Sequence, residues 1–248
     1  MTVGRGITAA VGLVLIIGAF VWGVSGLPAF GHYNFRYGAI VAKDAESDRS
    51  ATNSVVVTAF DYRAFDTLGE EFILFVSVAA VTVLLRRMRE EIDDDADELD
   101  LSKERSGSES MRWLGGALAA PIALLAVYII THGHLTPGGG FQGGVILMSA
   151  IVFVFIGGDY AVLKRVQGTS SWVEVIEALG AAAFAMLGFG GLVATGVFFA
   201  NFIDKGQGGL LTGGFIALAN VAVGLEVAAA LLVVISEMLY QRLLSVRR

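Results

Sequence analysis

The chain has 248 residues, of which 55% are hydrophobic and only 16% are charged, and its mean hydropathy is +0.71. Long continuous apolar runs at this composition indicate an α-helical membrane protein that crosses the bilayer several times. The net charge of −6 excludes a basic surface for nucleic acid, and the absence of cysteine excludes disulfides and cysteine-held iron–sulfur clusters.

Six segments predict membrane-spanning helices, because each approaches the roughly 20 apolar residues that a span requires. We place these spans at about residues 7–27, 68–86, 112–131, 141–163, 175–200 and 212–240. The first run is too long for the apolar core of a signal peptide, so we interpret it as a true span. The predicted fold class is therefore all-α, a polytopic membrane protein with about six transmembrane helices.

Two polar stretches separate these spans. We expect residues 28–66 to form a long polar loop whose second half is a short helix, lying in the membrane interface or packed on partner proteins. Residues 91–110 belong to an acidic stretch that begins EEIDDDADELD, with eight carboxylates in eleven residues. It lacks the glycine and the ligand spacing of a calcium loop, so a solvated cytoplasmic linker is predicted. The linker divides the chain into a two-helix module, residues 1–90, and a four-helix module, residues 111–248.

Lysine and arginine predict the orientation, because they concentrate in the cytoplasmic loops of membrane proteins. With the N-terminus inside, twelve of these residues lie on the cytoplasmic side and five on the outer side. Both termini are therefore predicted to be cytoplasmic, with the protein in the cell membrane.

The stretch HGHLTPGGGFQGG, residues 132–144, joins the third and fourth predicted spans and contains two of the three histidines. Two imidazoles do not complete a zinc site, which needs three or four protein ligands, so no metal site is predicted. A phosphate loop is excluded because the Gly-Lys-Ser/Thr motif is missing. A tight structural reversal with close helix packing is favoured. Its residues are His132, His134, Pro137, Gly138, Gly139, Gly140, Gly143 and Gly144.

Glu226 is the clearest candidate for ion handling, because it lies near the middle of the last apolar span. An ionisable side chain at that depth costs at least about 2.5 kcal/mol, so it is a functional candidate by default. It could exchange protons or bind a cation. The alternative is a structural glutamate that is hydrogen-bonded to a neighbouring helix.

A second group of charged residues precedes the second span. Thr67 and Glu70 have the spacing of a capping box, with Thr67 as the N-cap and Glu70 three residues later. Asp61, Arg63 and Asp66 lie just upstream and could pair with one another. Asp61 and Arg63 are candidates for a charged contact with a neighbouring subunit.

No Ser/His/Asp constellation or nucleotide motif is present, so neither an enzyme nor a cofactor is predicted. A transporter that works alone usually has a binding site between two repeats of broken helices. A single deeply buried carboxylate does not provide such a site. Large apolar faces with many glycines suit packing against other membrane subunits.

Two motifs resemble parts of one known family. HGHLTPGGGFQGGVILMSAIV, within about residues 112–244, resembles the B subunit of Mrp-type multisubunit Na⁺/H⁺ antiporters. NSVVVTAFDYRAFDTLGEEFILF resembles the end of the large A subunit of these antiporters, and also a small subunit of membrane-bound hydrogenases. The residues that match this second pattern are Asn53, Asp61, Arg63, Asp66, Thr67 and Glu70.

This resemblance implies a membrane subunit of a cation/proton antiporter that works with large proton-channel-like subunits and small membrane subunits. H⁺ would move inward and Na⁺ outward, and the chain would support assembly and belong to the cation path. The resemblance also adds Glu70 and Asp66 to Glu226 as candidates for that path. The alternatives are an ion-translocating subunit of a membrane-bound hydrogenase or complex I relative, and a scaffold without ion contact.

Overall fold

The computed structural model describes residues 2–27, 36–90, 108–156, 170–204, 206 and 209–246. All regular elements in these ranges are helices, and no strand occurs among them, which confirms the all-α class. The chain divides into two compact units, Met1–Ala39 and Ile40–Arg248. Apart from residues 108–110, the predicted acidic linker lies outside the described residues, so the predicted module boundaries stay predictions.

The first unit contains α1 (Thr2–Ser25), the helix of the first predicted span. Its long apolar side chains, such as Phe20 and Trp22, are exposed within the chain. Such a surface is stable only against lipid or another apolar protein surface. The helix α2 (Arg36–Arg49) crosses the boundary between the two units.

The prediction of a long polar loop is wrong for residues 36–49, which form α2, whereas the second half of the segment is helical as expected. Residues 36–66 contain α2, the one-turn helix α3 (Ser54–Val57), the π-helix η1 (Thr58–Tyr62) and the start of α4. Asn53 begins α3, since its side-chain oxygen accepts hydrogen bonds from the backbone N–H groups of Val55 and Val56 at 3.1 and 3.3 Å. The segment packs inside this chain and not in a membrane interface, because Val56, Val57 and Phe60 are buried.

Four of the described helices are long and apolar enough to cross a membrane. They are α4 (Ala64–Glu90), α6 (Glu109–Thr131), α9 (Ser170–Thr195) and α10 (Phe215–Val246). The remaining two predicted spans coincide with shorter apolar helices, Ala10–Ser25 within α1 and Gly140–Phe155 within α7 (Gly140–Ile156). The chain is therefore a multi-pass membrane protein.

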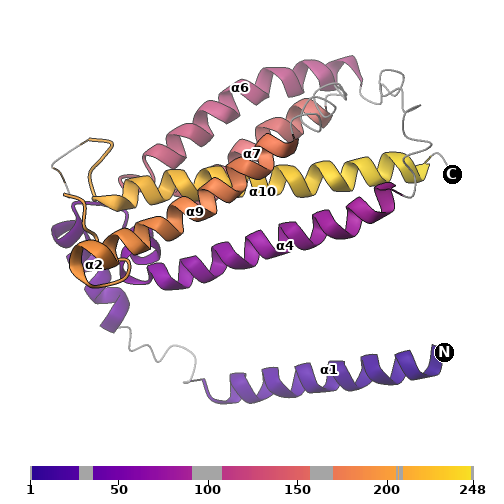
Figure 1. Cartoon of the computed structure of the whole chain (residues 1–248), viewed down its shortest axis with the longest axis horizontal. Helices are drawn as coiled ribbons and strands as arrows, with labels where there is room; N and C mark the ends of the chain where they lie inside the picture. Colours follow the sequence, from indigo (N-terminus) through magenta and orange to yellow (C-terminus); the bar gives the residue numbers. More distant parts are fainter. Residues whose placement is uncertain are drawn as a thin grey trace. The chain divides into compact units, whose positions relative to one another are not determined.

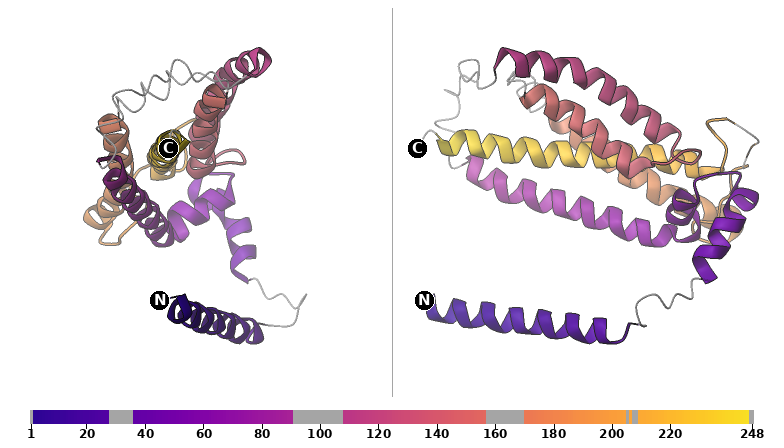
Figure 2. Two further views of the ribbon diagram at one scale, coloured as in Figure 1. Left: turned by 90° about the vertical axis from the view of Figure 1, so that its right-hand side faces the viewer. Right: turned by 180° about the vertical axis from the view of Figure 1, so that it is seen from behind.

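The central helix of the second unit is α10. In the most apolar stretch of α10, 56% of the residues are buried inside the protein. In the other three candidate spans the buried share is 11–22%. Seen end-on in the left view of Figure 2, α10 runs between the pair α4 and α9 and the pair α6 and α7. Figure 1 shows the same helix in side view, flanked along its length. A side chain in the middle of α10 is therefore surrounded by protein.

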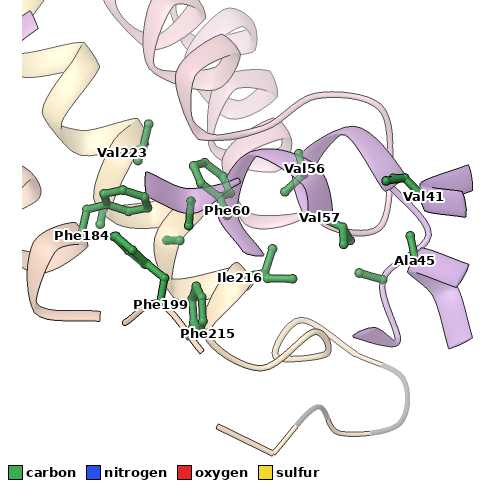
Figure 3. Close-up of a cluster of buried hydrophobic side chains, with 14 of the residues drawn as sticks. Val41, Ala45, Val56, Val57, Phe60, Phe184, Phe199, Phe215, Ile216 and Val223 are labelled. Carbon is green, nitrogen blue, oxygen red and sulfur yellow. The ribbon is translucent and has the colours of Figure 1, made fainter. Parts of the chain in front are cut away.

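The hydrophobic core lies where the short helices meet one end of α9 and α10 (Figure 3). Val56, Val57 and Phe60 pack there against the later part of the chain, with Phe184, Phe199, Phe215 and Ile216 on the other side. Phe60 and Phe184 are in edge contact, with ring centroids 5.7 Å apart. Two segments more than a hundred residues apart in the sequence thus form one core.

The starts of α7 and α10 are built alike. Asn220 accepts a hydrogen bond from the backbone N–H of Gly140 at 2.8 Å, and Asn201 accepts one from Phe215 at 3.1 Å. Each helix is thereby capped by an asparagine from elsewhere in the chain. The turn before α10 contains Gly213 and Gly214 with φ of +85° and +65°, a conformation that side chains with a Cβ rarely adopt.

Candidate functional site

Glu226 lies on α10, about three turns from the start of the helix, and its side chain is 0% exposed. Neither carboxyl oxygen has a hydrogen-bond partner among the described residues. The structural alternative, a glutamate hydrogen-bonded to a neighbouring helix, is therefore not what the structure shows. A buried polar group without a partner costs free energy, so it requires a reason other than stability.

Two further glutamates lie beside Glu226, and the sequence did not single them out for ion handling. Glu71 on α4 and Glu177 on α9 are each only 4% exposed. The charges of both interact with that of Glu226. The Glu71 and Glu226 carboxyl groups interact electrostatically, although no hydrogen bond joins them.

Small residues allow the helices to approach Glu226 closely. A Cβ added to Gly180 on α9 would lie 2.7 Å from the Cβ of Glu226 and 2.9 Å from the carbonyl oxygen of Ala222. On α7, a Cβ at Gly144 would lie 2.7 Å from the carbonyl oxygen of Gly224. Both glycines therefore pack their backbones directly against α10, as glycine does at membrane helix contacts.

A cavity of about 290 Å³ borders Glu71. Its wall comes from α3, η1, the start of α4, the start of α7 and one residue of α10, and it includes Glu70, Glu71, Phe60, Gln142 and Val223. Glu70, a predicted ion-path residue, thus lies at this cavity and is itself exposed. Asp66 is absent from the cavity wall, and its side chain is 61% exposed in an ion pair of 3.2 Å with Arg63.

The capping box predicted for Thr67 and Glu70 is wrong. The helix α4 begins earlier, at Ala64, and Thr67 lies within it. The Thr67 hydroxyl donates instead to the carbonyl oxygen of Ala59 at 2.7 Å, which ties α4 to η1. Tertiary contacts, and not a local cap, decide where this helix starts.

Asp61 is engaged inside the chain. Its carboxylate forms an ion pair with Arg49 at 2.7 Å and accepts a hydrogen bond from the Asn201 side chain at 3.4 Å. Asn201 also donates to the carbonyl oxygen of Gly213, so Asp61 helps to order the turn before α10. Arg63 pairs with Asp66 at the surface, and a contact of Asp61 and Arg63 with a neighbouring subunit stays a prediction.

The turn between α6 and α7 is held by Asn53, from the first half of the chain. The Asn53 side-chain amide donates to the carbonyl oxygens of Gly133 at 2.7 Å, Thr136 at 2.9 Å and Gly138 at 3.3 Å. Its backbone N–H donates to the carbonyl oxygen of His134 at 3.1 Å. These bonds satisfy four carbonyl oxygens of the turn and support its predicted structural role.

The predicted turn residues have little free space around them. A Cβ at Gly133 would meet the Asn220 side chain and Gly139 at 2.7 Å, and a Cβ at Gly143 would overlap Ile130. Gly138 and Gly139 have φ of +141° and +151°. Pro137 and Gly138 also line a shallow groove with Asn53.

The two histidines of the turn differ. His132 stacks on Tyr128, with ring centroids 4.3 Å apart, and its Nδ1 lies 3.2 Å from the Tyr128 carbonyl oxygen. His134 is buried, and neither ring nitrogen has a hydrogen-bond partner among the described residues. Burial lowers the pKa of the His134 imidazole. The backbone of Gly209 opposes this effect and the neighbouring His132 adds to it, so the pKa lies below its ordinary value.

Glu71 and Glu177 were not identified from the sequence, although a weak signal for each is present. Glu71 directly follows Glu70, and only the helical phase of α4, which buries Thr67, Glu71 and Val78, separates the two. The signal that was available is this spacing of four and seven residues along one helix face. Glu177 has a similar signal, since Gly180 and the buried Phe184 follow it at three and seven residues.

Two family models match the chain. One describes a domain related to the MnhB subunit of Na⁺/H⁺ antiporters and matches residues 110–233. The other describes the E subunit of MBH and matches residues 33–98. The two matches correspond to the two resemblances that the sequence motifs carry, in the same order.

Two curated relatives are similar to much of the chain, and one of them has an antiporter name. An uncharacterised protein of Methanocaldococcus jannaschii is 28% identical over 236 residues, which cover 88% of each chain. A probable K⁺/H⁺ antiporter protein of Rhizobium meliloti, whose name combines the A and B subunits, is 31% identical over 172 residues, covering 61% of this chain. These residues span only 16% of that relative, so its activity as a whole protein does not transfer directly.

Two solved structures resemble the whole chain. A chain of the membrane-bound sulfane sulfur reductase, an archaeal respiratory membrane complex, has a TM-score of 0.66 and 28% identity, covering 94% of this chain and 97% of that one. A chain of the Mrp complex from Dietzia sp. has a TM-score of 0.69 and 25% identity, covering 94% of this chain and 26% of that one. By its matched domain, the chain belongs to the family related to the MnhB subunit of Na⁺/H⁺ antiporters.

Proposed function

We propose that this chain is a membrane subunit of a multisubunit monovalent cation/proton antiporter, in which it supports assembly and lines part of the ion path. The observation that carries the proposal is Glu226, a carboxyl group buried in the central helix without a hydrogen-bond partner among the described residues. Membership in the MnhB-related family and the likeness to an Mrp complex chain support it. In this role the chain has no catalytic chemistry of its own.

Within this proposal the ion path includes Glu226, Glu70 and Asp66. Glu70 lies in the wall of the cavity that reaches Glu71, and Asp66 lies one helical turn earlier, at the surface. The exchanged cation is Na⁺ by the description of the family and K⁺ by the name of one relative. Protons would move inward as the cation moves outward, with both termini of this chain in the cytoplasm.

The role in assembly follows from the surface of the described helices. Large apolar side chains such as Phe72 on α4, Leu124 on α6 and Val193 on α9 are exposed within the chain. In the membrane these faces contact lipid or the apolar surfaces of other subunits. We propose that the large and small membrane subunits of the antiporter cover part of them.

The test is purification of the complex through a tag on this chain in mild detergent, followed by mass spectrometry and transport measurements. We expect several antiporter-type membrane subunits to co-purify. We also expect everted vesicles with the complete complex to release accumulated protons when Na⁺ or K⁺ is added. Vesicles from cells that lack only this chain should not respond. An equal response without this chain would contradict the proposal.

A second candidate is a membrane subunit of a redox-driven complex. One observation favours it: the resembling chain of the sulfane sulfur reductase is matched over 97% of its length, whereas the Mrp chain is matched over 26%, so the former corresponds to this chain from end to end. The same purification discriminates the two functions. Co-purifying iron–sulfur proteins would favour the redox complex, and their absence beside large antiporter-type subunits would favour the antiporter.

A further inference from the structure

Three carboxyl groups from three different helices lie in a row through the second unit. Glu71 comes from α4, Glu226 from α10 and Glu177 from α9, and all three are buried. Packing places Glu226 between the other two. Gly180, one helical turn after Glu177, lies against the Cβ of Glu226. Val223, one turn before Glu226, lines a cavity together with Glu71. Burial of three like-charged groups together is unfavourable unless protons neutralise them.

The absence of hydrogen-bond partners supports a function for this row. Both oxygens of Glu226 and one oxygen of Glu71 are buried and unpartnered among the described residues. A purely structural carboxyl group would be expected to donate or accept a hydrogen bond at this depth. Without such partners, these oxygens are available to exchange a proton or to bind water.

Each end of the row opens to a cavity. The cavity of about 290 Å³ borders Glu71 and also Glu70. A separate cavity of about 270 Å³, between α4, α9 and α10, borders Glu177 and also Glu174. Both cavities are large enough and polar enough at these glutamates to hold water. Glu226 lines neither cavity, so it separates them.

The arrangement suits protons better than a metal cation. A hard cation that has lost its water needs several oxygen ligands converging on one point. Within the described residues, no group of three or more carboxylate or histidine side chains could hold such an ion. The three glutamates lie in series on helices, where the backbone carbonyls are already hydrogen-bonded.

Three further helices pack on α10, namely η1, α6 and α7. The titratable residues of η1 are Asp61, which pairs with Arg49, and Tyr62, which donates to Asp48. On the opposite side of α10, α7 contributes Gly144, and the residues of α7 include no titratable side chain. The titratable residues of α6 are Glu109, Arg112 and Tyr128, near its two ends. The protonation of Glu71, Glu226 and Glu177 therefore depends mainly on these three groups themselves. Glu70 and Glu174, which line the cavities, are further carboxyl groups beside them.

We propose that Glu71, Glu226 and Glu177 form a proton relay through this chain that connects the two cavities. The proposal rests on the proposed antiporter function and adds Glu71 and Glu177 to it. A proton on the carboxyl group of Glu71 moves to the carboxylate of Glu226 and then to the carboxylate of Glu177. Each transfer breaks one O–H bond and forms another, and water in the cavities supplies and removes the proton.

The first test uses the complete complex in everted vesicles, with Glu71→Gln, Glu226→Gln and Glu177→Gln as separate variants. Each should lower the maximal rate of cation/proton exchange by roughly 100-fold, because an amide cannot pass on a proton. The apparent KM for the cation should stay unchanged. Glu226→Asp should recover part of the rate, and Glu109→Gln, an exposed glutamate on α6, should behave as wild type.

The second test does not depend on transport. Dicyclohexylcarbodiimide reacts with protonated carboxyl groups in apolar surroundings, and mass spectrometry locates the adduct. The purified complex should be labelled at Glu71 and Glu177, which border the cavities, and not at Glu109. Prior substitution of Glu226 by Gln should change the pH dependence of the labelling at Glu71, since the two groups interact.

The outcomes separate the relay from the antiporter function. Wild-type exchange with undiminished rates in all three Gln variants would overturn the relay and leave the proposed function intact. A higher KM at an unchanged maximal rate would show cation binding and also overturn it. If the wild-type complex exchanges no cation, the proposed function fails. Carbodiimide labelling then decides the relay, and a complex in which neither Glu71 nor Glu177 is labelled overturns it.

Discussion

At the scale of single residues, the buried His134 makes the turn between α6 and α7 sensitive to acid. Burial lowers the pKa of its imidazole below the ordinary value of 6.5, so the folded protein resists its protonation. The unfolded chain therefore takes up the proton first as the pH falls. The free energy of unfolding should be unaffected above about pH 6.5 and should fall as the pH drops below that value.

The measurement is thermal unfolding of the detergent-purified protein at about pH 7.5 and about pH 5.5, on either side of the ordinary histidine pKa. The wild type should lose more thermal stability on acidification than His134→Gln, which carries no titratable group. His132→Gln serves as the control, because His132 stacks on Tyr128 and keeps a polar contact. Equal acid sensitivity of the wild type and His134→Gln would remove this histidine as the cause.

Of the three buried glutamates, only Glu226 can be identified from the sequence alone. Glu226 can be singled out because an isolated carboxylate in the middle of an apolar span is conspicuous at any helical phase. The choice between Glu70 and Glu71 requires the rotation of α4, which an almost uniformly apolar helix does not reveal. Glu177 lies near a helix start, where a carboxylate has an ordinary electrostatic explanation.

At the scale of helices, the apolar segments were predictable and their arrangement was not. Lipid and protein interior are both apolar, so a buried helix and a lipid-facing helix have similar sequences. The central position of α10 therefore emerges only from the structure. A short helix was expected where α3 and η1 lie, but not its burial inside this chain, because that burial comes from packing against Phe184, Phe215 and Ile216, far along the chain.

The approach of α9 to α10 depends on Gly180. A methyl group there would lie 2.7 Å from the Cβ of Glu226 and 2.9 Å from the backbone nitrogen of Glu226 and the carbonyl oxygen of Ala222, and backbone atoms cannot rotate away. We expect Gly180→Ala to lower the free energy of unfolding by about 1–3 kcal/mol, the usual cost of overpacking. Thermal unfolding in detergent measures this change.

Gly116→Ala on α6 is the matched control, since no atom lies within 4 Å of the added Cβ. It should be neutral or stabilising by up to about 1 kcal/mol, because alanine favours the helix more than glycine does. Equal stability of the two variants would mean that α9 does not pack against α10 as closely as the structure indicates.

At the scale of the whole molecule, the two segments that match different family models are joined by more than the chain between them. Val56, Val57 and Phe60 of the first match share a core with Phe184 and Phe215 of the second. Asn53 holds the turn between α6 and α7, and Asp61 contacts Asn201. A polypeptide comprising residues 1–90 alone would leave these apolar and polar groups exposed to water or lipid.

We therefore expect residues 1–90 and 108–248, expressed as two polypeptides in the same membrane, to associate and co-purify through a tag on either one. Asn53→Ala should weaken this association by about 2–4 kcal/mol, because it removes three side-chain hydrogen bonds and the cap of α3. Ser77→Ala, whose hydroxyl bonds only within α4, is the control and should co-purify as wild type. Two halves that fold separately and do not co-purify would contradict the shared core. Loss of association in Asn53→Ala alone would show that this asparagine, which binds a turn 80 residues away, couples the two family segments.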